Sequence, residues 1–245
     1  MRFQALAALI EMELKKLVRQ PANLFLNLLF PAVLTITFLF AFTDPELGMN
    51  INSLVPGLIV YAVIFVIMTI AQSFSTERQE GLLRRLNTTP MTSSEFMGSQ
   101  IITHMLISAV QVIIVLALAF LLGFRPDSGI VGIFLAFPVI AVFSLSSVGL
   151  GLITATVSKT PEAATGVSFV FILPQMFFGT FVPITNTTRQ IASVIPSYYA
   201  LDALRLIFQG DWTNPNILLD VGVVSIVSIA IVILGILLFE KYGST

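Results

Sequence analysis

The chain has 245 residues, of which 56% are hydrophobic and only 10% are charged, so its composition is that of an integral membrane protein and excludes an ordinary soluble domain. Its net charge of −1 argues against nucleic acid as a partner. No cysteine is present, which excludes disulfides, zinc–thiolate sites and thiol catalysis.

Residues 3–20 have the pattern of an amphipathic helix. Apolar side chains recur at spacings of three and four on one face, and the charged residues Arg2, Glu11, Lys15, Lys16 and Arg19 are largely elsewhere. Pro21 ends the pattern. We expect a helix that lies in the inner membrane interface and leads into the first span. It serves either as an anchor alone or also in docking a partner.

Six stretches are apolar over roughly the 20 residues that a helix needs to cross a bilayer. They cover about residues 22–42, 54–75, 98–122, 130–157, 163–182 and 217–239. Gly149 and Gly151 in the fourth allow a neighbouring helix to approach closely. The economical interpretation is an all-α integral membrane protein with one domain over residues 1–245.

Ionisable residues are almost absent from these spans, and we expect no buried carboxylate of the kind that a proton or sodium relay needs. Asp220 lies near the start of the sixth span, where the membrane interface can solvate it. His104 in the third span is the single histidine. A lone membrane histidine more often forms a hydrogen bond to a neighbouring helix than carries protons.

The distribution of Lys and Arg predicts the orientation, because cytoplasmic loops carry an excess of both. With both termini in the cytoplasm, nine of the 12 cations lie inside, and the three outside are Arg125, Arg189 and Arg205. The protein is therefore expected in the cell membrane, with multiple spans and cytoplasmic termini.

A mixed-charge segment, residues 76–96, separates the second and third spans, where helix–helix connections usually have about 2–8 residues. Glu80 and Arg84 stand in the favoured i, i+4 order, so we expect residues 77–87 to continue the second span as a helix. Pro90 then breaks the helix, and Thr92 to Glu95 form a capping box for the third span.

This pattern predicts a rigid cytosolic elbow with a leucine stripe and a charged rim, a shape that suits insertion into a groove on a cytosolic partner. The alternative is a loop that only supplies positive charge for orientation.

The outer segment, about residues 183–216, has two short apolar faces separated by Pro196, and Gly210 ends the second. Two short helices that dip into the outer leaflet fit this pattern, and the alternative is an ordinary surface loop.

The chain lacks the Gly-rich loop and lysine that usually cradle nucleotide phosphates, since no glycine is followed by lysine. We therefore expect no catalytic site and no cofactor on this chain, and a mover of solutes would need energy from elsewhere.

Two motifs resemble the ABC-2 type transporter permeases, which include drug-resistance and polysaccharide or lipid exporters. The first is Glu77-Arg78-Gln79-Glu80-Gly81-Leu82-Leu83-Arg84-Arg85-Leu86 with Thr88-Thr89-Pro90, although the family often has Thr where Leu82 stands. The second is Phe181-Val182-Pro183 followed by Ile195-Pro196-Ser197-Tyr198-Tyr199-Ala200-Leu201-Asp202-Ala203-Leu204-Arg205. With the spans, the two motifs cover nearly the whole chain.

The resemblance implies a permease subunit of an ATP-hydrolysing complex. It implies two copies of a separate cytosolic ATPase that binds ATP and Mg, and a second permease subunit, forming a homodimer. The elbow would be the coupling helix, with the coupling residues Glu77, Arg78, Glu80, Gly81, Leu82, Arg84, Thr89 and Pro90. Residues 183–209 would be an extracellular helical hairpin that closes the pathway outward, with the gate residues Pro183, Pro196, Tyr198, Asp202 and Arg205.

The function expected on these grounds is export of an amphiphilic substrate such as a drug, lipid or glycan. Two alternatives stay open: an ion-coupled transporter that uses His104 and Asp220, and a non-transporting scaffold that recruits a cytosolic partner.

Overall fold

The computed structural model describes residues 3–19, 21–42, 50–81, 93–181 and 186–242, and every regular element among them is a helix. In chain order these are α1 (Phe3–Arg19), α2 (Pro21–Phe42), α3 (Ile51–Ile64), α4 (Val66–Gln79), α6 (Ser93–Leu121), α7 (Gly129–Val157), α8 (Pro161–Met176), the π-helix η2 (Phe177–Phe181), α9 (Asn186–Ala192), α10 (Pro196–Phe208) and α11 (Pro215–Tyr242).

Five stretches of the described residues are long and apolar enough to cross a membrane: Ile51–Gln79, Glu95–Leu121, Gly129–Val157, Pro161–Gly179 and Pro215–Phe239. The expected first span corresponds to the 22-residue helix α2, whose fully described part includes the apolar stretch Leu28–Phe42. A helical protein with multiple membrane spans is therefore confirmed. The count of six spans and the single domain over 1–245 stay predictions.

Proline and capping side chains set the helix boundaries. Pro21 separates α1 from α2 and supplies the first residue of α2, a position where its missing N–H costs nothing. Asn50 caps α3 by accepting a hydrogen bond from the Ser53 amide at 2.8 Å, and Thr160 caps α8 in the same way from Ala163 at 3.2 Å. The helix α6 begins at Ser93, next to the expected capping residue Thr92, which lies outside the described residues.

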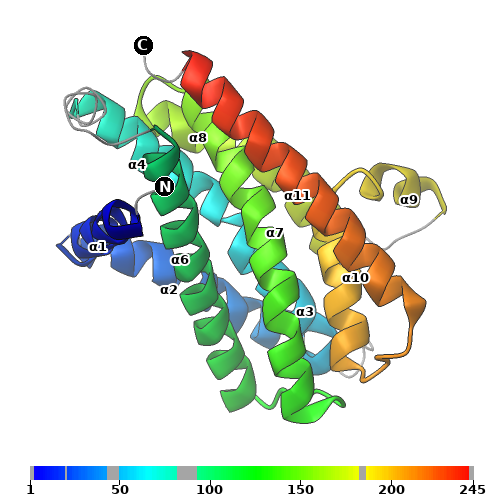
Figure 1. Cartoon of the computed structure of the whole chain (residues 1–245). Helices are drawn as coiled ribbons and strands as arrows, with labels where there is room; N and C mark the ends of the chain where they lie inside the picture. The colour runs from blue at the N-terminus through cyan, green and yellow to red at the C-terminus, as the bar shows by residue number, and fades with distance from the viewer. Residues whose placement is uncertain (1–2, 20, 43–49, 82–92, 182–185, 243–245) are drawn as a thin grey trace.

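The second span is the centre of the bundle. This span, Ile51–Gln79, comprises α3 and α4, and 89% of the residues in its most apolar stretch are buried. The corresponding fraction for α11 is 17%. Figure 1 shows α6, α7 and α11 running side by side, with α1 and the end of α4 near the start of α6, and with α9 on the opposite side of the bundle. The end of α4 is thus the place where the central span reaches the surface.

The small residues of the fourth span do let helices approach closely. A Cβ added to Gly149 would lie 2.8 Å from the Val232 backbone nitrogen of α11. A Cβ on Gly151 would lie 2.9 Å from the Ile67 carbonyl oxygen of α4. The helix α7 therefore packs backbone to backbone between the central span and α11.

Candidate coupling site at the end of the second span

Glu77, in the last turn of α4, is fully buried and joins three helices. Lys16 Nζ of α1 donates to Glu77 Oε1 at 2.6 Å. Gln100 Nε2 of α6 lies 3.3 Å from both carboxylate oxygens. An ionised carboxylate can be buried only with such donors, so the sequence position of Glu77 fixes where α1 and α6 pack.

A second carboxyl group, that of Glu13 in α1, faces the same place. Glu13 is only 2% exposed, and Glu77 and Gln100 both act electrostatically on its carboxyl group. Lys16 Nζ is 4.0 Å from Glu13 Oε2, while Glu13 Oε1 has no partner. Burial, and then the neighbouring charge of Glu77, raise the pKa of Glu13 to about 7.

The sequence analysis missed Glu13, although a signal was present. Glu13 follows Ile10 by three residues and precedes Leu17 by four, so it belongs to the apolar stripe of α1. An acidic residue within an apolar stripe indicates a buried partner.

Arg78, the next residue of α4, points to a different pair of helices. Its guanidinium donates to the carbonyl oxygens of Ala155 and Ser158 at the end of α7, both at 3.1 Å. The guanidinium carbon lies 5.9 Å from the centre of the Phe239 ring of α11. The last carbonyls of a helix lack partners within it, so an arginine fork satisfies two of them at once.

We define the junction as the side chains of Glu13, Lys16, Glu77, Arg78 and Gln100. It connects α4 to α1, α6, α7 and α11. Glu77 and Arg78 were expected on the charged rim of the elbow, but they point into the bundle instead.

Beyond the junction the helix stops. The expected helix over 77–87 is wrong in this respect, because α4 ends at Gln79 and Gly81 has a φ of +70°. A residue in the left-handed region terminates an α-helix, and glycine adopts it without a steric penalty. Glu80 is exposed at the helix end. Four coupling residues, Leu82, Arg84, Thr89 and Pro90, lie outside the described residues.

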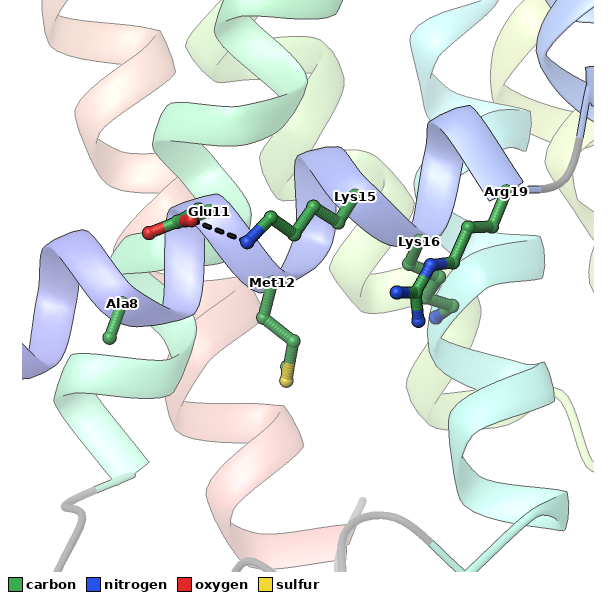
Figure 2. A pocket seen from close by; sticks show the side chains of 6 residues that line it. All are labelled: Ala8, Glu11, Met12, Lys15, Lys16 and Arg19. Atoms are coloured by element: carbon green, nitrogen blue, oxygen red, sulfur yellow. Dashed lines mark hydrogen bonds and ion pairs between the residues drawn. The ribbon is translucent and has the colours of Figure 1, made fainter.

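An open hollow of about 640 Å³ lies along the exposed side of α1. Figure 2 shows its lining residues, with Glu11 and Lys15 joined by an ion pair and with Lys16 and Arg19 further along the helix. The Lys16 side chain is 26% exposed, whereas those of Glu13 and Glu77 are at most 3% exposed. Lys16 therefore connects the buried junction to the surface.

The predicted gate residues lie along α10, from its first residue Pro196 to Arg205 in its last turn, except Pro183, which is outside the described residues. Pro196 begins α10 and is buried. Tyr198, Asp202 and Arg205 recur at i, i+4 and i+7 and so share one helix face. Burial lowers the pKa of Arg205, and burial together with Asp202 raises that of Tyr198.

Three expectations about the spans are wrong. Asp220 is not solvated: it is 4% exposed, Asp202 acts electrostatically on it, and its Oδ2 has no partner among the described residues. With Glu77, it shows that the spans do hold buried carboxyl groups. His104 contacts its own helix, with Nδ1 2.9 Å from the Gln100 carbonyl oxygen, and its Nε2 has no partner on a neighbouring helix among the described residues.

The family model of the ABC-2 type transporters matches residues 4–208. The chain belongs to this family. It is 27% identical over 223 residues to the daunorubicin resistance ABC transporter permease protein DrrB1 of Streptomyces coeruleorubidus, covering 86% of this chain and 76% of that protein. It is 28% identical over 134 residues to the probable multidrug ABC transporter permease YbhR of Escherichia coli K12, covering 54% of this chain and 36% of that protein.

Membership of the ABC-2 family confirms the resemblance of the two motifs and shows that the chain is a membrane subunit of an ABC transporter. The family implies that ATP is bound on a cytosolic partner. In the parts of the chain that the structure describes, no group of three or more His, Asp or Glu residues could hold a metal ion.

Proposed function

We propose that this permease subunit exports an amphiphilic substrate and that a separate cytosolic ATPase drives it through residues 76–96. The observation that carries the proposal is the junction. Two consecutive residues, Glu77 and Arg78, bind side chains or backbone of α1, α6 and α7 and contact α11. A force applied just beyond Gln79 would therefore act on four helices at once.

Rigid helices held by buried polar contacts move as units, because a packed interior switches between discrete arrangements rather than deforming gradually. The elbow after α4 would be the coupling helix, with Glu80 and Gly81 nearest the junction and Leu82, Arg84, Thr89 and Pro90 further along. The complex would contain two ATPase copies and two copies of this permease.

The substrate class comes from the relatives and from composition. DrrB1 is named for daunorubicin resistance and YbhR as a probable multidrug permease. Apolar walls suit an amphiphile with a planar aromatic body, so daunorubicin is the first compound to test. On the outer side Pro183, Pro196, Tyr198, Asp202 and Arg205 would belong to a gate that closes the pathway between transport cycles.

The test uses inverted membrane vesicles that contain this chain and its ATPase, sought as a Walker-motif protein encoded in the neighbouring reading frame. We expect ATP-dependent accumulation of daunorubicin. Gly81→Pro and Glu80→Arg should abolish ATP-stimulated accumulation while leaving membrane insertion intact. Normal transport by both variants would contradict the coupling assignment.

The same vesicles separate the alternatives. Transport that a proton uncoupler stops while ATP persists would indicate ion coupling, and the buried Asp220 would be its first candidate residue. A partner that co-purifies but whose ATPase rate no solute changes would indicate a scaffold.

A further inference from the structure

The junction contains two buried carboxyl groups but one lysine. Glu13 and Glu77 are 2% and 0% exposed, and the charge of Glu77 acts on Glu13. Lys16 Nζ contacts Glu77 at 2.6 Å and Glu13 at 4.0 Å. If both carboxyl groups were ionised, one negative charge would stay uncompensated in a site that excludes water, which is strongly unfavourable.

The other groups that face Glu13 do not supply the missing positive charge. On α6, Gln100 acts on Glu13 and is neutral, and His104 lies close enough to Lys16 to interact electrostatically with it. A charged His104 would be buried beside the lysine with an Nε2–H that has no acceptor among the described residues. Repulsion and burial both oppose that state, so the histidine is not the compensating cation.

We propose that Glu13 and Glu77 form a proton-binding site, in which one shared proton holds α1 against α4 and α6. The proton resides on Glu13, because Lys16 and Gln100 both donate to Glu77, whereas Glu13 Oε1 has no partner. Protonated Glu13 becomes a donor to Glu77 and removes the excess charge. Release of the proton to water leaves two facing carboxylates, whose repulsion drives α1 away from α4.

The proton can enter and leave at the hollow along α1, which Lys16 lines from the junction side (Figure 2). Since the pKa of Glu13 is raised to about 7, this carboxyl is protonated below neutrality and ionised above it. The contact of α1 with the bundle is then complete in acid and is lost as the pH rises through about 7. Its effect on transport rests on the proposed function: α4 would push α1 only while the proton is bound.

The test needs neither the ATPase nor a substrate, so its failure would be distinct from failure of the proposed function. The full chain in lipid nanodiscs is studied by amide hydrogen exchange of α1 at pH 6 and pH 8, with rates corrected for the intrinsic effect of pH. We expect protection of α1 to fall by roughly tenfold per pH unit above neutrality, following the ratio of protonated to ionised Glu13. Equal protection at both pH values would overturn the proposal.

Three variants sharpen this result. Glu13→Gln stays neutral and should keep α1 protected at both pH values. Glu77→Gln should do the same, because a single carboxylate then balances Lys16, whereas a purely structural role of Glu77 would loosen α1 at every pH. Glu11→Gln is the matched control on the exposed side of α1, where Glu11 pairs with Lys15, and it should keep the wild-type loss of protection. A wild-type pH response in Glu13→Gln, or loosening at both pH values in Glu77→Gln, would contradict the shared proton.

Discussion

Lys16 on α1 and Glu77 on α4 are 61 residues apart in the sequence, yet their Nζ and Oε1 atoms lie 2.6 Å apart. The lysine is the one cation within reach of two buried carboxyl groups in the described part of the junction. Lys16 is part of the amphipathic helix α1 at the edge of the bundle. The ion pair therefore holds the N-terminal helix against the central span.

Replacing Lys16 by methionine should destabilise the protein, because it leaves two buried carboxyl groups without a cation. Removing one partner of a buried ion pair costs about 3–5 kcal/mol, and we expect a value near the lower limit since Lys16 is partly exposed. Thermal unfolding in detergent measures the effect. Lys15→Met removes an exposed ion pair with Glu11 and should cost much less, because solvent screens exposed charges. Equal losses for the two variants would show that the junction contributes no more than a surface pair.

Arg78→Lys should weaken coupling without preventing insertion. An ammonium group cannot reproduce the fork that reaches the Ala155 and Ser158 carbonyls together, so α4 and α7 would no longer move as one. We expect ATP-stimulated transport in inverted vesicles to fall roughly tenfold.

The matched control for Arg78 is Arg125→Lys. Arg125 also donates to two carbonyls, that of Phe120 in the last turn of α6 and that of Phe124 just beyond it, at the end of α6 away from the junction. Its replacement should leave ATP stimulation unchanged. If both variants lost stimulation equally, the effect would come from general destabilisation rather than from the position of Arg78.

Gly149→Ala should separate α7 from α11. The added Cβ would meet backbone atoms of Ile231 and Val232 at 2.8–2.9 Å, and backbone cannot rotate away as a side chain can. We expect a loss of about 1–3 kcal/mol in the free energy of unfolding. Gly222→Ala on α11, where a Cβ meets nothing within 4 Å, should be neutral or slightly stabilising. A neutral Gly149→Ala would mean that the two helices are not in backbone contact.

Cysteine labelling tests the orientation, and the absence of native cysteine gives a clean background. Lys159 between α7 and α8 and Asp211 between α10 and α11 are both exposed. A membrane-impermeant maleimide should label Asp211→Cys in intact cells and Lys159→Cys only after the membrane is opened. The reverse pattern would place the termini outside and the junction on the wrong side for a cytosolic ATPase.

The sequence by itself determined the class of protein, most of the helices and the family. Runs of about 20 apolar residues are sufficient to predict a membrane-spanning helix, because a spanning segment must satisfy its backbone hydrogen bonds internally. The pattern of α1 and its end before Pro21 are equally local. The end of α4 at Gln79 also had a local signal, because Gly81 is a residue that commonly terminates a helix. The prediction gave more weight to the favourable Glu80–Arg84 spacing and so extended the helix.

The tertiary structure alone decided which polar residues meet. Nothing near Glu77 in the sequence indicates that Lys16 and Gln100 will surround it, or that Asp220 will be enclosed beside Asp202 instead of reaching the interface. Such contacts depend on which faces of distant helices pack together. Periodicity in the sequence predicts which face of each helix is buried. The close backbone approaches at Gly149 and Gly151 decide which helices pack against α7 and how closely. The packing of the helices in turn decides the environment of the buried charged residues.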